Sequence, residues 1–217
     1  MITVKSFCFN SFEENTYVLS DTSGECIIID PGCHMTEEEN ELTGYISENN
    51  LKPVRLINTH CHIDHILGNS FIAGKYTLRL EANENELPVL SASGYVSQMY
   101  QIQLNPSPEI EKFINEGDIV KFGNSQLEVF FTPGHSPGSL TFYSREDKFI
   151  ISGDVLFESS IGRTDLPGGD YDTLIASIIT KILPLGDDVI VYSGHGNSTT
   201  VGAEKRLNPF LREHLQY

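Results

Sequence analysis

His60-Cys61-His62-Ile63-Asp64-His65 is the stretch that decides how this sequence is interpreted. Three histidines and an aspartate placed so closely would partly repel one another when charged and would gain little when neutral, so a plain surface turn is a poor explanation. Imidazole nitrogens and carboxylate oxygens are ligands that zinc, iron and manganese all accept. The stretch therefore predicts a metal site.

The segment before this stretch predicts how its side chains are directed. An apolar run at 53–58 is typical of a strand and leads directly into the histidines. If the strand continues through His62, the side chains of His60 and His62 point to the same side and can hold one ion. A turn after His62 would then direct Asp64 and His65 to a second, neighbouring position.

Three other predicted strand ends carry residues that can complete a two-metal site. These are His135 in Thr132-Pro133-Gly134-His135-Ser136-Pro137-Gly138, Asp154 in Ser152-Gly153-Asp154, and His195 in Ser193-Gly194-His195-Gly196. Prolines and glycines hold such loops in one shape, as a ligand position requires. A carboxylate has two oxygens, so Asp154 can bridge two cations. Each residue alone is more often an ordinary turn or surface residue, and the prediction depends on finding all of them together.

The remaining histidines and the cysteines are not expected to bind metal. His34 lies next to a turn that can place it near the mouth of the site, and His214 is expected on an exposed helix. No two cysteines form a C-x-x-C pair, so we expect reduced, structural thiols. Cys61 lies between two ligand positions and should face away from the metals, where it would serve in packing.

Apolar runs and turn residues predict strands and helices in two similar waves. We expect strands at 2–9, 16–19, 26–29, 53–58, 119–122, 127–132, 140–143, 149–152 and 189–192, and helices at 36–49, 65–76 and 171–182. Segment 81–100 is expected to be mostly helical, 157–170 an irregular loop, and 203–215 a helix broken by Pro209. Two waves of this kind predict a four-layer α/β sandwich, with two packed sheets and helices outside. No linker interrupts them, so a single domain over 1–217 is expected.

Composition limits the partners. The formal net charge of -16 disfavours nucleic acid as a partner, because such a surface repels phosphates. No apolar stretch approaches the roughly 20 residues that span a bilayer, and the first residues do not resemble a secretory signal. We therefore expect a cytoplasmic protein without a membrane or nucleic-acid partner. Its oligomeric state is left open.

Taken in chain order, H-x-H-x-D-H, T-P-G-H, G-D and G-H-G resemble the metallo-β-lactamase superfamily. Segments 152–157 and 162–165 make the chain most similar to the short glyoxalase II-like hydrolases of that superfamily. The resemblance implies an αββα sandwich and two divalent metal ions, zinc in the first instance, with iron or manganese as alternatives. It implies that the first ion is held by His60, His62 and His135, the second by Asp64, His65 and His195, and that Asp154 bridges them.

The implied activity is hydrolysis of a small-molecule thioester, as in hydroxyacylglutathione hydrolases, by a hydroxide that bridges the two ions and is oriented by Asp64. The alternative is a persulfide dioxygenase that uses a single iron on similar ligands. Many antibiotic-degrading members have a cysteine where this chain has Asp154, so β-lactam hydrolysis is not expected as the main role. A scaffold role is disfavoured because no ligand position is missing.

Two features leave the substrate open. Only 22 residues follow His195, too few for the helical domain that supplies basic groups for glutathione in longer relatives. The basic residues of this tail are expected to be solvated. Arg163 can bind a substrate carboxylate, or it can pair with Asp165 or Asp170 and hold its glycine-rich loop in shape. We favour the second interpretation of Arg163.

Overall fold

The runs of apolar residues pair into two six-stranded sheets in the computed structural model, which describes residues 1–214. In the first sheet the strands follow chain order: β1 (Thr3–Phe9), β2 (Glu14–Ser20), β3 (Glu25–Ile29), β4 (Lys52–Ile57), β5 (Leu80–Ala82) and β6 (Ile110–Phe113). Strands β1 to β3 are antiparallel, and β3 to β6 are parallel.

The second sheet has the order β14 (Thr199–Thr200), β13 (Ile190–Ser193), β10 (Phe149–Gly153), β9 (Leu140–Ser144), β8 (Ser125–Phe131) and β7 (Ile119–Phe122). Only the β10–β13 pair in it is parallel, among the strands of residues 1–214. A small hairpin of β11 (Leu156–Phe157) and β12 (Ser160–Ile161) lies outside both sheets.

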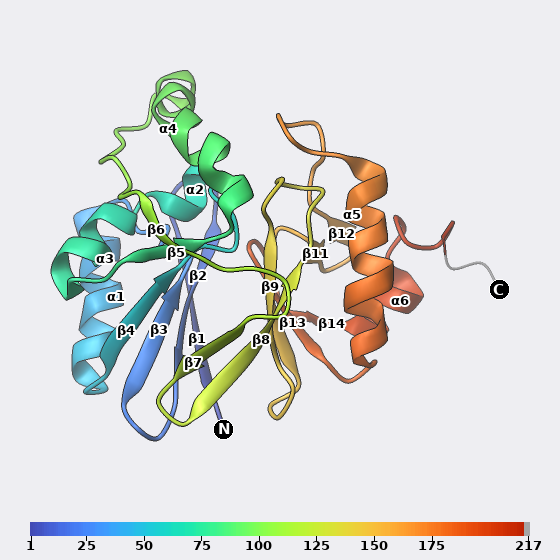
Figure 1. Cartoon of the computed structure of the whole chain (residues 1–217), viewed down its shortest axis with the longest axis horizontal. Coiled ribbons are helices and arrows are strands. Elements are labelled where there is room, and N and C mark those ends of the chain that lie inside the picture. Colours follow the sequence, from blue (N-terminus) through green and yellow to red (C-terminus); the bar gives the residue numbers. More distant parts are fainter. Residues whose placement is uncertain (215–217) are drawn as a thin grey trace.

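Helices cover the outer face of each sheet (Figure 1). On the first sheet lie α1 (Thr36–Glu48) and α3 (Asn69–Tyr76), whereas α2 (Ile63–Ile66) and the segment of η1 (Glu84–Glu86) and α4 (Leu87–Tyr100) lie toward its upper end in this view. On the second lie α5 (Tyr171–Ser177), its continuation η2 (Ile178–Ile182), η3 (Leu183–Leu185) and α6 (Val201–Leu207). The predicted four-layer α/β sandwich is therefore confirmed.

Three hydrophobic clusters hold the layers together. In β3, Ile27 and Ile29 face the second sheet, while Cys26 and Ile28 face the helices. A strand buried on both faces has no polar alternation, which explains the continuous apolar run at 26–29. The third cluster packs α5 and η2 against the outer face of the second sheet.

The strand before the histidines is shorter than predicted. Strand β4 ends at Ile57, so His60 and His62 lie in a loop rather than on a strand. The reason is that side-chain carboxylates accept the backbone N–H groups of this loop. Asp30 accepts from Thr59 at 2.7 Å, and Glu86 accepts from Cys61 at 2.7 Å. The expectation that His60 and His62 share a side because of strand pleating was wrong, although both side chains do reach the same site.

Other boundaries also differ from the predictions. Strand β6 was not predicted, because its sequence Ile110–Phe113 is half charged, as in an edge strand. The loop at 157–170 includes part of the small β11–β12 hairpin. The tail helix α6 ends at Leu207, and Asn208 before the proline is extended, as residues before proline prefer. Residues 209–214 form turns rather than helix, and position 215 lies outside the described residues.

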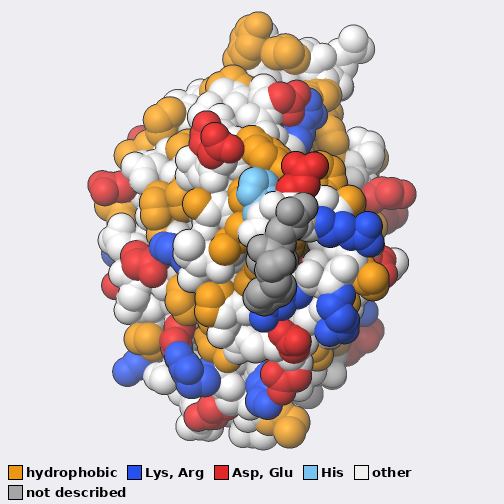
Figure 2. All heavy atoms as spheres, turned by 90° about the vertical axis from the view of Figure 1, so that its right-hand side faces the viewer, with side chains coloured by type: hydrophobic (Ala, Val, Ile, Leu, Met, Phe, Trp, Pro, Cys, Tyr) orange, Lys and Arg blue, Asp and Glu red, His pale blue; other side chains and the backbone are white. Residues whose placement is uncertain are grey.

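On the face that carries α5 and α6, basic and acidic side chains lie intermixed (Figure 2). Lys205 of α6 pairs with Asp187 at 3.2 Å and Arg206 approaches the same carboxylate at 3.9 Å, so these tail cations have a local partner. No helix within residues 1–214 is long and apolar enough to cross a membrane.

Candidate metal centre

Four loops meet at one edge of the two sheets and bring the predicted ligand residues together. These loops follow β4, β8, β10 and β13, and they carry the histidine stretch, His135, Asp154 and His195 respectively. Loops at such edges are positioned by the rigid strands that precede them. The candidate ligands therefore do follow the ends of strands, as predicted. Strand β4 ends earlier than expected, so its loop is longer.

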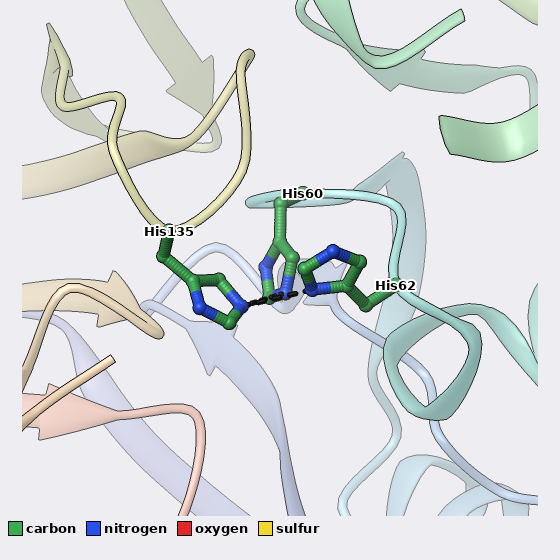
Figure 3. A group of neighbouring side chains, drawn as sticks. All are labelled: His60, His62 and His135. Carbon is green, nitrogen blue, oxygen red and sulfur yellow. Dashed lines mark hydrogen bonds between the residues drawn. The ribbon is translucent and has the colours of Figure 1, made fainter. Parts of the chain in front are cut away.

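Three histidines form the first candidate position (Figure 3). Nδ1 of His62 lies 2.8 Å from Nε2 of His135, which lies 3.2 Å from Nε2 of His60. Four ligand atoms placed tetrahedrally at 2.0–2.1 Å from a zinc ion lie about 3.4 Å from one another. The three nitrogens therefore have the proximity that one ion requires.

The second candidate position combines Asp64, His65 and His195. Oδ2 of Asp64 lies 3.1 Å from Nε2 of His195 and 3.6 Å from Nε2 of His65. Asp154 lies between the two positions. Its Oδ1 is 3.5 Å from His65, and its Oδ2 is 3.4 Å from His135 and 3.6 Å from His195.

Four histidines are oriented by contacts on their outward-facing nitrogen. In each, Nδ1 faces an oxygen: Thr59 Oγ1 for His60, Asp30 Oδ2 for His65, the Arg163 carbonyl for His135 and the Phe12 carbonyl for His195. A carbonyl oxygen can only accept, so Nδ1 of His135 and His195 donates a proton to it. When these rings are neutral, Nε2 therefore presents its lone pair to the centre, as metal-binding histidines do.

Two buried atoms at the centre have no hydrogen-bond partner: Nε2 of His65 and Oδ1 of Asp154. Both residues are almost entirely buried. A buried polar atom without a partner is costly, and here the unpartnered atoms belong to the sets that approach one another. A cation placed among them would satisfy both, so the residues present fit a bound metal ion.

Asp30 belongs to a further acidic and histidine group with His60 and His65. Its oxygens already accept hydrogen bonds from the Thr59 backbone, the Thr59 hydroxyl, the Asn58 amide and His65. A carboxylate occupied in this way orients His65 rather than binding an ion itself. The backbone of Asp30 has a φ of 50°, a strained value that the surrounding contacts maintain.

The two positions differ in their electrostatics. Burial and the neighbouring histidines lower the pKa of His60, and burial followed by His135 lowers the pKa of His62 to about 4. At the second position burial also opposes the charged form, but Asp64 and Asp154 outweigh it and raise the pKa of His65. The second position therefore attracts positive charge, which either a proton or a metal ion can supply.

All seven predicted ligand residues come together at this centre, and metal binding by them stays a prediction. The two other histidines lie elsewhere. His34 contacts the Gln103 carbonyl through Nε2 at 2.7 Å, and the ring of His214 lies 6.3 Å from that of Tyr171. Cys61 is buried in the cluster between the first sheet and its helices, which agrees with the packing role expected for it.

Arg163 is placed differently from the other candidates. Its guanidinium makes two hydrogen bonds of 2.7 Å to the carboxylate of Asp165, and its carbonyl accepts from His135. The pairing with Asp165 is one of the two partners considered for a loop-holding role. Substrate binding by Arg163 stays a prediction.

Among the buried acids that the sequence analysis did not single out are Asp30, Glu86 and Glu14, whose Oε1 lies 3.8 Å from Nδ1 of His65. Asp30 directly follows the buried strand β3, and an acidic residue at the end of such a strand is a signal that a sequence can show. Glu86 was not singled out at all, and nothing in its local sequence distinguishes it from the acidic residues around it.

The model of the metallo-beta-lactamase superfamily matches residues 11–195. This chain belongs to that superfamily of metallo-hydrolases. It is 38% identical over 207 residues to the hydroxyacylglutathione hydrolase GloC of Haemophilus influenzae, covering 93% of this chain and 94% of that protein. The resemblance predicted from the motifs is confirmed.

Two solved structures extend the comparison to the fold. The BLEG-1 B3 metallo-beta-lactamase superposes with a TM-score of 0.89 at 35% identity, covering 97% of this chain and all of that one. TTHA1623 in a di-iron-bound form superposes with a TM-score of 0.86 at 32% identity, covering 96% of this chain and 100% of that one. The order of helices and strands described above is therefore shared over nearly the whole chain.

Proposed function

We propose that this protein hydrolyses small-molecule thioesters at a two-metal centre. The observation that carries the proposal is the position of Asp154, whose carboxylate approaches His135 of the first position through Oδ2 and His65 and His195 of the second through Oδ1 and Oδ2. One carboxylate placed between two sets of nitrogen ligands is the arrangement that a bridging ligand requires.

Some residues of the centre are fully buried and would hold the metal ions, whereas others are partly exposed and face the substrate. His60 and His65 are fully buried, whereas the side chains of Asp64 and His195 are 14% and 26% exposed. A substrate therefore approaches from the side of Asp64 and His195. Two divalent ions bound at the centre would lower the pKa of a water molecule and polarise the thioester carbonyl.

Asp64 is the residue we assign to orienting the attacking water. Burial opposes its ionisation, but His65 and the contact with His195 outweigh burial and lower the pKa of Asp64. The ionised carboxylate can accept a hydrogen bond from water at the exposed side of the centre.

A thioester suits a centre of this composition. A thiolate leaves readily because a thiol has a pKa of about 8.5, so its departure needs no strong proton donor. The imidazoles and carboxylates that converge here would hold the metal ions through their inward atoms, and none has to act as a general acid. The similarity to a hydroxyacylglutathione hydrolase supports the same substrate class.

Zinc is the metal we propose, because histidine nitrogens and carboxylate oxygens at tetrahedral spacing suit it. Iron accepts the same ligands, and a di-iron form of a similar protein has been solved. Elemental analysis of the purified protein decides between them and gives the number of ions per chain.

The test of the activity is a panel of thioesters, including S-lactoylglutathione, assayed with the metal-loaded protein and with protein stripped by a chelator. We expect thioester cleavage that is lost on stripping and regained on adding metal. Full activity in the stripped protein would refute the proposal.

The same preparation distinguishes the rival activities. One iron per chain, together with oxygen uptake on glutathione persulfide, would refute thioester hydrolysis as the activity and support the dioxygenase reaction. Cleavage of a chromogenic β-lactam faster than of any thioester would replace it with the activity named for BLEG-1.

A further inference from the structure

Glu86 is a fully buried glutamate directly before α4, and its carboxylate joins two separate loops. Oε2 accepts the backbone N–H of Cys61 at 2.7 Å. Oε1 accepts the hydroxyl of Ser136 and the backbone N–H of Gly138, both at 2.6 Å. One side chain thus receives three hydrogen bonds from residues 25, 50 and 52 positions away in the sequence.

The two loops are those that carry the first candidate metal position. Cys61 lies between His60 and His62, and Ser136 follows His135 directly. His135 is 73 residues from His62 and 75 residues from His60 in the sequence. Its Nε2 nevertheless lies 2.8 Å from Nδ1 of His62 and 3.2 Å from Nε2 of His60. Some contact must hold the two loops at this separation, and Glu86 touches the backbone of both.

The carboxylate fits its place closely. A Cβ on Gly138 would lie 2.7 Å from Cγ of Glu86, 2.8 Å from Oε1 and 2.9 Å from its backbone nitrogen. Burial raises the pKa of Glu86, while the hydrogen bonds from Ser136, Cys61 and Gly138 act in the opposite direction. Burying a carboxylate costs solvation, so Glu86 is not expected to add much to the stability of the fold. Its hydrogen bonds therefore indicate a role in positioning the two loops.

We propose that Glu86 is a positioning residue for the first metal position. Its carboxylate sets the separation between the loop of His60 and His62 and the loop of His135, and thereby the affinity and geometry of the ion bound there. The inference rests on the proposed metal centre but does not depend on the thioester as substrate.

The test compares Glu86→Gln with Glu204→Gln. Glutamine has nearly the same shape, but an NH₂ donor replaces one acceptor oxygen. The new NH₂ group then faces an N–H or O–H donor, and a hydrogen bond is lost. Glu204 is a matched control because it is also buried and accepts three hydrogen bonds, from Ser159, Thr199 and Asn208, none of which is a candidate ligand.

The readout is metal binding itself. Stripped protein is titrated with Co²⁺, and the visible absorption spectrum of the bound cobalt is recorded. Loss of a group that orients metal ligands typically weakens metal affinity by about 10–100-fold. We expect a loss of this size for one of the two ions in Glu86→Gln, with a changed cobalt spectrum. Both ions should bind Glu204→Gln as tightly as wild type, even if that variant unfolds more easily.

A second variant keeps the inference testable if Glu86→Gln does not fold. Ser136→Ala removes one of the three hydrogen bonds and should weaken the same ion by a few-fold, in the same direction. Wild-type affinity and spectrum in Ser136→Ala, or in a folded Glu86→Gln, would overturn the proposal. Metal binding without thioester cleavage in wild type would refute the proposed substrate alone, and failure of wild type to bind metal would overturn both.

Discussion

The first candidate metal position consists of three histidines, whereas the second combines Asp64 with two histidines. In the first, burial and mutual proximity lower the pKa values of His60 and His62, so the rings are neutral and ready to bind a cation at neutral pH. In the second, carboxylates raise the pKa of His65 against the effect of burial. The first position therefore depends on how its loops are held, and the second depends on a positive charge being present.

The surrounding contacts follow the same division. Glu86 joins the two loops of the first position through backbone and hydroxyl donors. Asp30 acts mainly on the second, through His65, although it also holds Thr59 next to His60. Asp154 approaches Nε2 of His135 in the first position and Nε2 of His195 in the second through the same oxygen, Oδ2. Variants of these acids therefore separate the contributions of geometry and charge.

Replacing Asp154 should have the largest effect, because it removes the carboxylate that we propose as the bridge between the two positions. We expect Asp154→Ala to lose at least one ion and to lower kcat/KM by about 10³-fold or more, as loss of an essential charge at a metal centre does. Metal content and thioester kinetics measure both effects. The exposed Asp172→Ala is the control and should resemble wild type. Two tightly bound ions in Asp154→Ala would show that the two positions are independent.

Single histidine variants should remove one metal ion at a time. His135→Ala should lose the ion of the first position and His195→Ala that of the second, and each should lower kcat/KM by about 10²-fold or more. The measurement is the number of ions per chain together with the kinetics. His34→Ala controls for the loss of a histidine outside the centre, because its ring contacts Gln103 instead. Loss of both ions in every variant would mean that the two positions bind only together.

Asp30→Asn should have a smaller effect, directed at the second position. The new amide nitrogen would face donors where a carboxylate oxygen now accepts from His65 or Thr59. We expect the affinity of the second ion to fall by about 10–100-fold, as for other groups that orient metal ligands. Titration with Co²⁺, compared with Glu86→Gln, measures which ion is weakened. Equal weakening of the same ion by both variants would contradict the division between the two acids.

The sequence predicted the ligand residues better than the contacts that position them. His60 to His65, His135, Asp154 and His195 each stand in a short local pattern, and a pattern of this kind can be found without knowing the fold. Glu86 contacts partners at least 25 residues away, and Asp30 meets Thr59 across 29 residues, so no local window contains both ends of either contact.

The same limitation explains the error at β4. Periodicity predicted that the strand would continue through the histidines, but whether a backbone N–H meets a neighbouring strand or a side-chain carboxylate is decided by tertiary structure. The alternating waves of apolar runs were sufficient to predict two sheets, because burial on both faces leaves a clear signal in the sequence. The charged edge strand β6 leaves no such signal.

Replacing Arg163 should have the smallest effect, and it tests whether this side chain binds the substrate or only holds its loop. Its ion pair with Asp165 is exposed, at 56% and 68% for the two side chains, and such pairs contribute little stability. If Arg163 only holds its loop, Arg163→Ala and Asp165→Ala should change kcat/KM alike, by about 2–5-fold for a contribution below 1 kcal/mol. If Arg163 binds a substrate carboxylate, Arg163→Ala should raise KM by about 10-fold or more, whereas Asp165→Ala should leave KM unchanged or lower it by freeing the guanidinium. Measuring KM and kcat for both variants, on thioesters with and without a carboxylate, separates these roles, because only the binding role distinguishes the two substrates.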